Sequence, residues 1–141
     1  PFVKMLSEAV GRRADDSGKI RTIGGRLCHF DLWEPHGFGI KKPLKHAEAL
    51  REHGPGIKRA FTYKALNKLI QGSAADMTKL SMLALYREGV IPHIQIHDEL
   101  DISVASVQES DKIIRIMEEA VQLQVPNKID LEQGDSWGDI H

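Results

Sequence analysis

The sequence predicts an α+β fold in which an antiparallel sheet packs against long helices. Three observations support this prediction. Short apolar stretches on either side of Gly24-Gly25 are typical of a β-hairpin. Residues 57–88 contain no proline and a single glycine, and their apolar residues recur at helical spacing. Residues 94–102, IQIHDELDI, alternate apolar and polar residues around a central acidic pair, as two half-buried strands and a turn do.

The composition is that of an intracellular globular chain. Its 141 residues, of which 41% are hydrophobic, suffice for one domain or a substantial piece of a larger one. No apolar run approaches the roughly 20 residues that span a membrane, and the first residues lack the apolar core of a signal peptide. We therefore expect a cytoplasmic location and no membrane partner. Cys28 is the only cysteine, which excludes an internal disulfide and predicts a buried, unreactive thiol.

The charges are divided unevenly along the chain. Residues 1–96 hold 16 Lys and Arg against 9 Asp and Glu, a balance of +7, whereas residues 97–141 hold 3 against 11, a balance of −8. Such a division suits a protein that binds a polyanion with one surface and cations with another, although solvated helix faces give the same count.

The first 56 residues predict a helix, a hairpin and an irregular excursion. Apolar residues at helical spacing predict the helix over 2–13, and the hairpin that follows has Gly24-Gly25 as its two-residue turn. Residues 31–56 contain three prolines and four glycines around a basic stretch. They predict an inserted excursion with a short helix that starts at Pro43.

Residues 57–88 predict one long helix, which Gly89 is placed to end. At 100° per residue one of its faces is apolar, and consists of Leu66, Leu69, Ile70, Ser73, Met77, Leu80 and Ala84. The other face is polar, basic and slim, and consists of Lys64, Asn67, Lys68, Gln71, Ala75 and Thr78.

The polar face suits a nucleic acid. Asn67 and Gln71 lie one turn apart, and neutral amides can reach base edges in a minor groove while Lys64 and Lys68 approach phosphates. An ordinary solvated helix face is the alternative. Arg26, next to the predicted glycine turn, either contacts phosphate in the same way or is simply exposed.

The stretch at 94–102 places a carboxylate, Asp98, where the alternation calls for an apolar residue. If its flanks pair as an antiparallel hairpin, Asp98-Glu99 is the two-residue turn at the tip. Asp-Glu is an unfavourable pair for a two-residue turn, so we expect a functional role to outweigh the turn preference at these positions. Two adjacent carboxylates beside His97 suggest Mg²⁺, which takes oxygen ligands and keeps waters that a phosphate can displace. A solvated acidic turn is the alternative.

The rest of the chain predicts one more helix and an extended end. Ser106 is placed to cap a helix over 107–123, and residues 128–132 predict a last extended segment.

Two stretches together resemble the C-terminal part of family A, or polymerase I-like, DNA polymerases: RAFTYKALNKLIQGSAADMTK at 59–79 and IQIHDELDISV at 94–104. The resemblance covers nearly the whole chain and is weakest at 31–56. It implies that residues 1–56 end the fingers, with an insertion at about 31–56. Residues 57–141 would then belong to the palm, an antiparallel sheet whose hairpin carries His97-Asp98-Glu99.

The resemblance implies nucleotidyl transfer with two Mg²⁺ ions held by carboxylates, acting on primer–template DNA and deoxynucleoside triphosphates. Asp98 matches a metal-binding aspartate, Glu99 its auxiliary neighbour, and His97 a position against the primer end.

Further positions match that family's contacts with the primer–template minor groove. They are Asn67 and Gln71 on the helix and Gln95 on the strand before the turn. The family has an arginine where this sequence has Tyr63.

Nothing in the sequence matches the family's second metal-binding aspartate or its fingers helix. We therefore expect the isolated chain to be inactive, and its two-metal site to be completed by an N-terminal part of the polymerase, in cis or in trans. A non-catalytic nucleic-acid-binding module with a palm fold is a second hypothesis, which the intact His97-Asp98-Glu99 argues against. A third is a metal-dependent phosphohydrolase that uses Asp98 with His93 and His97, histidines that are as easily structural.

Overall fold

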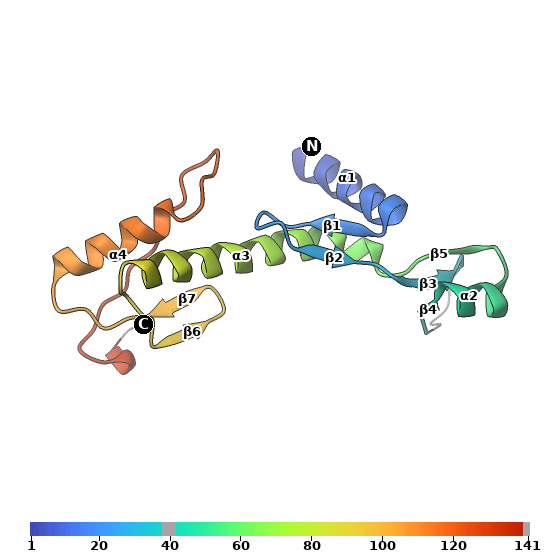
Figure 1. The fold of residues 1–141 in the computed structure, drawn as a ribbon. Coiled ribbons are helices and arrows are strands. Elements are labelled where there is room, and N and C mark those ends of the chain that lie inside the picture. The colour runs from blue at the N-terminus through green and yellow to red at the C-terminus, as the bar shows by residue number, and fades with distance from the viewer. Residues whose placement is uncertain (38–41, 140–141) are drawn as a thin grey trace. The chain divides into compact units, whose positions relative to one another are not determined.

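The computed structural model describes residues 1–37 and 42–139, so part of the predicted excursion and the last two residues lie outside the described part. The elements in order are α1 (Phe2–Ser17), β1 (Lys19–Arg21), β2 (Leu27–His29), β3 (Leu32–Pro35), β4 (Leu44–Lys45), α2 (His46–His53), β5 (Ile57–Arg59), the 3₁₀ turn η1 (Thr62–Lys64), α3 (Ala65–Arg87), β6 (Ile94–Ile96), β7 (Glu99–Asp101), α4 (Val107–Glu119) and η2 (Trp137–Asp139) (Figure 1). Every strand pair among the described residues is antiparallel, and the strands form three small sheets, β1-β2, β4-β3-β5 and β6-β7. The predicted α+β class is confirmed, with several small sheets in place of one.

The chain divides into two compact units, Pro1–Ser73 and Ala74–His141, and the division falls within α3. The two units are described separately below. The expected division of the sequence at residue 56, into the end of the fingers and the palm, rests on the resemblance rather than on compactness and stays a prediction.

The core of the first unit lies where α1 packs on the β1–β2 hairpin (Figure 1). Its buried members are Val10, Ala14, Ile20, Phe30 and Ala65, and its partly buried neighbours are Leu6, Cys28, Phe61, Leu66 and Leu69. The thiol of Cys28, expected to be buried, is thus only partly so. Helix α1 runs beyond the predicted end at residue 13 to Ser17.

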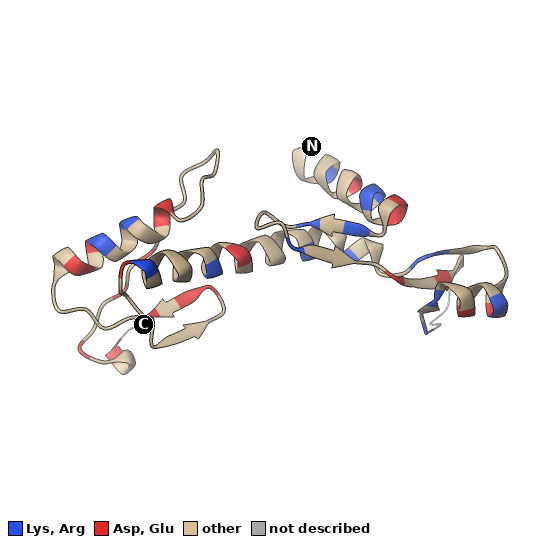
Figure 2. Ribbon diagram, in the orientation of Figure 1, with Lys and Arg blue, Asp and Glu red and all other residues tan. Residues whose placement is uncertain are grey.

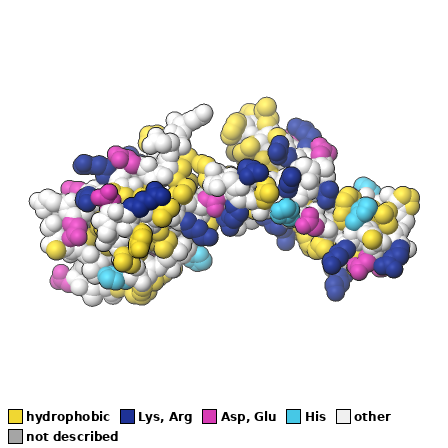
Figure 3. All heavy atoms as spheres, viewed as in Figure 1, with side chains coloured by type: hydrophobic (Ala, Val, Ile, Leu, Met, Phe, Trp, Pro, Cys, Tyr) yellow, Lys and Arg dark blue, Asp and Glu magenta, His cyan; other side chains and the backbone are white. Residues whose placement is uncertain are grey.

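The N-terminal end of α1 is apolar and exposed. Phe2, Val3 and Met5 keep 73%, 69% and 65% of their surface in contact with solvent, and hydrophobic side chains gather at this end of the helix in Figure 3. A contiguous apolar surface of this kind commonly marks a contact site for another segment or chain.

The predicted turn of the first hairpin is wrong by one residue. Thr22 N donates to Arg26 O at 2.9 Å, so the loop has three residues, Ile23, Gly24 and Gly25. Gly25 N donates to Thr22 O at 3.0 Å, and Gly25 has a positive φ of 87°. This pattern is a type I turn followed by a residue in the left-handed region, which a two-residue turn does not allow.

The described residues of the excursion at 31–56 form one helix and, with β5, a small sheet. β3 is central, pairing with β4 through Leu32 and Trp33 and with β5 through Trp33, Glu34 and Pro35. The helix predicted from Pro43 is wrong at its start: β4 comes first and α2 begins at His46.

Arg59, at the end of β5, connects this small sheet to the rest of the first unit. Its Nε donates to the carbonyl of Asp15 and its Nη1 to that of Phe30, both at 3.0 Å. Its guanidinium lies 4.6 Å from the centre of the Trp33 ring. One side chain therefore holds together the end of α1, the end of the hairpin and the excursion.

The helix predicted over 57–88 is wrong in its first residues and confirmed in the rest. Residues 57–59 pair with β3, and η1 separates them from α3. Strand pairing supplied by a distant segment outweighs the local helical periodicity there. Gly89 ends the helix as predicted, with Val90 N bonded to Leu85 O at 2.9 Å and Gly89 N to Tyr86 O at 3.1 Å, the Schellman pattern.

The two predicted faces of α3 are only partly confirmed. Leu66 and Leu69 pack on the core, and the basic residues are exposed. Ile70 and Leu80, expected to be inward, are 55% and 37% exposed, whereas Thr78, expected to be outward, is 8% exposed.

The second unit is built on α4 and the last turns of α3. Ser81 Oγ donates to Met117 O at 3.5 Å, and Lys112 pairs with Glu88 at 3.1 Å. Ser106 caps α4 as predicted, accepting from Glu109 N at 3.3 Å. The helix ends at Glu119 rather than at residue 123.

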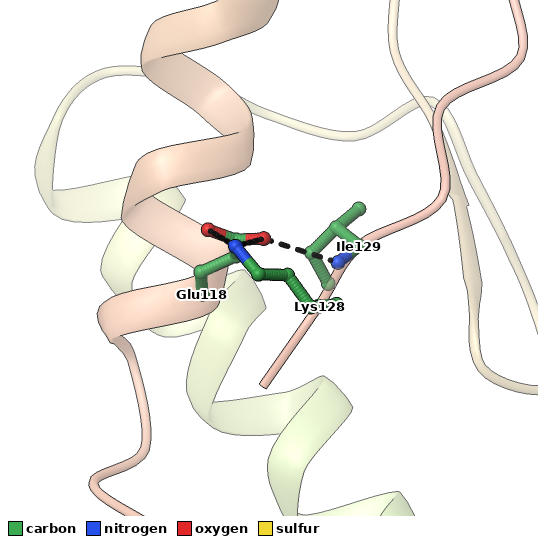
Figure 4. A network of polar contacts seen from close by, with 3 residues as sticks. All are labelled: Glu118, Lys128 and Ile129. Carbon is green, nitrogen blue, oxygen red and sulfur yellow. Dashed lines mark hydrogen bonds and ion pairs between the residues drawn. The ribbon is translucent and has the colours of Figure 1, made fainter. Parts of the chain in front are cut away.

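The segment after α4 is held without strand pairing. The predicted extended segment over 128–132 has no ladder among the described residues. Instead, the carboxylate of Glu118 accepts from Lys128 Nζ at 3.3 Å and from Ile129 N at 3.4 Å (Figure 4). Within the described residues, no helix combines the length and apolar character needed to cross a membrane.

Candidate functional site

The residues expected to contact a nucleic acid lie at the start of α3, in the first unit. Lys64 ends η1, and Asn67, Lys68 and Gln71 follow within two turns of the helix. All four side chains are exposed, and spacings of three and four residues place them on one side of the helix. We call these four residues the α3 face.

Both cations of the α3 face lie against aromatic rings. Lys64 Nζ is 5.2 Å from the centre of the Phe61 ring and 5.6 Å from that of Tyr63, and Lys68 Nζ is 4.8 Å from that of Phe30. Cation–π contacts restrict the long lysine side chains while their ammonium groups stay in solvent. The two positive charges are therefore presented from oriented side chains.

Arg26 has a contact that the sequence did not predict. Its Nη2 donates to the carbonyl of Gly72 at 2.8 Å, and the hairpin makes a second bond to the helix from Ile23 N to Ser73 Oγ at 3.2 Å. A Cβ on Gly72 would lie 2.8 Å from Thr22 Cγ2, so the small residue admits the hairpin. The side chains of Thr22 and Arg26 thus occupy the space beside Gly72, and a phosphate contact of Arg26 stays a prediction.

The other candidate residues form the tip of the β6–β7 hairpin, in the second unit. The register pairs Ile96 with Glu99, so the turn residues are His97 and Asp98. The predicted Asp98-Glu99 turn is therefore wrong by one residue, and Glu99 begins β7. We call His97, Asp98 and Glu99 the hairpin tip; all three are exposed.

This register also changes the faces of the hairpin. Residues directly opposite share a face, so Ile94 and Ile96 lie with Glu99 and Asp101, and Gln95 lies with Leu100. The ribbon of β7 is accordingly acidic at both ends (Figure 2). The expected half-buried apolar row is not formed, because β6 and β7 pair only with each other among the described residues and β6 is exposed throughout.

The backbone of the tip is strained. His97 has a φ of 53°, a conformation that non-glycine residues adopt rarely, although histidine more often than most. The Gln95 amide donates from Nε2 to His97 O at 3.0 Å, which fixes the turn from the preceding strand. His93 Nε2 lies 3.1 Å from Ser103 Oγ, so that histidine is tied to the segment that follows β7.

Comparisons with known proteins decide the family. The model of DNA polymerase family A matches residues 1–139. The chain belongs to DNA polymerase family A. A DNA-directed DNA polymerase of Pseudomonas phage M6 is 36% identical over 138 residues, which are 98% of this chain and 18% of the relative. DNA polymerase I of Treponema pallidum is 37% identical over 150 aligned residues, which cover 100% of this chain and 13% of the relative.

A solved structure supports the same family assignment. The POL domain of Pol1 from M. smegmatis, in complex with a DNA primer-template and dNTP, aligns with a TM-score of 0.67 and 26% identity. The alignment covers 98% of this chain and 23% of that one. The chain therefore spans less than a quarter of the length of these relatives, and the resemblance seen in its sequence is confirmed.

The carboxylates of the tip fit a magnesium ion in part. Asp98 and Glu99 are adjacent, exposed oxygen donors of the kind that Mg²⁺ prefers. Within residues 1–37 and 42–139, however, no group of three or more His, Cys, Asp or Glu side chains is arranged to hold a metal ion. Asp98 and Glu99 alone would therefore make only part of the donor set of such an ion.

The structure adds three residues that the sequence analysis did not assign. Phe61 has a φ of 64°, Tyr63 is 78% exposed, and Arg59 makes the backbone contacts described above. Tyr63 was noted in the sequence only as a departure from the family's arginine, and no local pattern marks Phe61 or Arg59, since backbone strain and convergent contacts depend on tertiary structure.

Proposed function

We propose that the chain is the C-terminal palm portion of a family A DNA polymerase and takes part in template-directed DNA synthesis. Under this proposal residues 1–56 end the fingers and residues 57–141 form part of the palm. The observation that carries the proposal is the pairing of β6 and β7, which projects Asp98 and Glu99 from an exposed tip. Its relatives come from a phage and from bacteria, which favours the cytoplasm of a bacterium or of a phage-infected cell.

In this proposal the hairpin tip holds the metal ions from one side. Asp98 is a ligand, Glu99 its auxiliary neighbour, and His97 lies against the primer end. Bound Mg²⁺ would activate the primer hydroxyl and neutralise charge on the triphosphate. The bond from Gln95 to the His97 carbonyl keeps the tip in one conformation, which limits the reorganisation needed to bind a cation.

The α3 face would bind primer–template DNA. The amides of Asn67 and Gln71 can donate to the minor-groove acceptors that all base pairs share, and Lys64 and Lys68 neutralise phosphates. Arg26 would add a contact beside the α3 face, and Gln95, in the second unit, would also contact DNA. Exposure of all four side chains of the face and the orientation of both lysines support this role.

The remaining ligands and the triphosphate site would come from an N-terminal part of the polymerase, in cis or in trans. The exposed apolar end of α1, with Phe2, Val3 and Met5, suits such a segment. The small donor set at the tip also favours a second candidate, a nucleic-acid-binding module without catalysis, which the following test distinguishes.

The test uses the Pseudomonas phage M6 polymerase with its matching segment replaced by this chain. Primer extension by this chimera is compared with that of its Asp98→Ala variant. We expect extension to fall by about 10³-fold or more, because a lost metal contact removes several kcal/mol of transition-state stabilisation. Primer–template affinity should be unchanged.

Asp101→Asn is the matched control, since it removes a charge from the same hairpin two residues beyond the tip. It should extend primers at the rate of the unaltered chimera. Normal extension by Asp98→Ala would exclude the metal assignment. A chimera that binds DNA and extends nothing, with or without the substitution, would favour the non-catalytic module.

A further inference from the structure

The small sheet β4-β3-β5 leaves one of its faces open to solvent. On the other face, the centre of the Trp33 ring lies 4.6 Å from that of His46 in α2 and 4.6 Å from the Arg59 guanidinium. That face is therefore covered by α2 and by the arginine. The resemblance to family A is weakest in this part of the chain, so it assigns no role to the face that stays open.

Four side chains make up the open face. Residues directly opposite one another share a face, as do residues two apart on one strand. Leu32 of β3 lies opposite Lys45 of β4. Glu34, two residues further along β3, lies opposite Lys58 of β5. We call these four residues the sheet face; the leucine and both lysines are exposed.

The sheet face carries two positive charges and one negative charge. Glu34 Oε1 lies 3.4 Å from Lys58 Nζ, and 29% of the glutamate side chain is exposed against 49% of the lysine side chain. The lysine is thus more accessible than its partner, and an ion pair at the surface is weak enough for a phosphate to compete with it. Lys and Arg side chains appear over the start of α3 and again over the excursion in Figure 3.

The sheet face is held in place relative to the α3 face, within the same unit. The side chain of Arg59 donates to the carbonyls of Asp15 and Phe30, both at 3.0 Å, which docks β5 on the core of the first unit. Residues 60 and 61 alone separate β5 from η1, where Lys64 begins the α3 face. Lysines on a docked sheet lose less conformational freedom on binding than lysines on a mobile loop.

We propose that the sheet face is a further DNA-binding surface of this chain, and that its partner is the sugar–phosphate backbone of duplex DNA. Lys45 and Lys58 each neutralise a phosphate without reading the base sequence. Surfaces that hold single strands stack bases on exposed aromatic rings, and the sheet face has none, because Trp33 lies on the covered side. The proposal rests on the proposed function of the α3 face and adds a second contact to the duplex held there.

The experiment measures binding of the 141-residue chain to a fluorescent, blunt-ended DNA duplex, by anisotropy at several salt concentrations. Lys45→Gln with Lys58→Gln should lower the slope of log K against log salt by about 1.8, since about 0.9 is lost with each phosphate contact. Glu34→Gln should strengthen binding about two- to five-fold, because it removes the ion pair with which the phosphate competes.

Arg51→Gln is the matched control, with the same loss of charge in the same excursion. Arg51 is exposed on α2, and it lies two residues beyond the buried Ala49, on the side of the helix away from the sheet. Its slope should equal that of the unaltered chain, and a slope lowered by about 0.9 would show a diffuse charge effect and overturn the proposal. Circular dichroism checks the fold; if the double variant unfolds, Glu34→Gln decides, and unchanged or weaker binding by it overturns the proposal.

The inference fails separately from the function on which it rests. An unchanged slope in Lys45→Gln with Lys58→Gln, alongside a lowered slope in Lys64→Gln with Lys68→Gln, would overturn the sheet face and leave the α3 face standing. A loss seen only with a duplex that carries a single-stranded 5′ overhang would assign the lysines to the template strand and overturn the duplex contact. Unchanged slopes in both double variants would remove the α3 face as well.

Discussion

Gly72 and Thr22 meet where the first hairpin lies on α3. Thr22 is 4% exposed, and its Oγ1 exchanges hydrogen bonds with the Arg26 backbone, accepting from N at 3.1 Å and donating to O at 3.2 Å. The threonine is therefore not free to rotate away from the helix. Only a residue without a Cβ leaves room for its methyl group at this position.

Gly72→Ala should destabilise the chain by about 1 kcal/mol. Overpacking typically costs about 1–3 kcal/mol, which exceeds the roughly 1 kcal/mol that alanine gains over glycine inside a helix. Urea unfolding followed by circular dichroism measures the change.

Gly11→Ala in α1 is the matched control, since nothing lies within 4 Å of a Cβ there. It should stabilise the chain by about 0.5–1 kcal/mol. Two substitutions of the same kind are thus expected to have opposite signs, and a stabilising Gly72→Ala would contradict the close packing of the hairpin on the helix.

At the scale of the elements, the excursion is integrated into the first unit through Arg59. Its guanidinium donates to two backbone carbonyls and lies over the Trp33 ring. These three partners belong to α1, to the end of the first hairpin and to β3. A Cβ on Gly18 would lie 2.6 Å from Arg59 Cζ, so the end of α1 is also shaped around this side chain.

Arg59→Ala should destabilise the chain by about 3 kcal/mol, from two hydrogen bonds of a charged donor at about 1.5 kcal/mol or more each and a cation–π contact. Chemical denaturation of the variant tests this value. Arg59→Lys keeps the charge but not the forked donor, so it should recover less than half of the loss. Full recovery by lysine would mean that charge, rather than geometry, holds the excursion.

At the scale of the whole molecule, the uneven charge along the sequence corresponds to the two candidate surfaces. The α3 face, with its two lysines, belongs to the basic part, and the acidic hairpin tip to the other. Under the proposed function, the basic surface would bind a polyanion and the acidic one its metal ions, because a surface of one sign repels one of the two.

Removal of the two lysines should therefore change how salt affects DNA binding. Lys64→Gln with Lys68→Gln is expected to lower the slope of log K against log salt by about 1.8, since about 0.9 is lost with each phosphate contact. Anisotropy titrations of the 141-residue chain provide the slope. Lys4→Gln on α1, also exposed, should leave it unaltered, and a drop as large as that of the double variant would show a diffuse charge effect.

Several elements follow from the sequence, because periodicity, capping chemistry and glycine conformation act within a few residues. They are the long helix, its end at Gly89, the Ser106 cap and the existence of both hairpins. The α3 face and the acidic tip were named from the sequence for the same reason. The boundaries of η1 and β5 were not predictable, since residues 57–59 become a strand only by pairing with β3.

By itself, the sequence determined the α+β class, the candidate residues and the resemblance to family A polymerases, all of which rest on local pattern. Tertiary structure alone decided that His97 and Asp98, not Asp98 and Glu99, form the turn, and that Arg26 and Gly72 dock the hairpin on α3. It also decided that Phe61 is strained while Tyr63 is exposed. Close approach is set by segments distant in sequence, and the register of a hairpin by the geometry of its turn; an alternation of apolar and polar residues records neither.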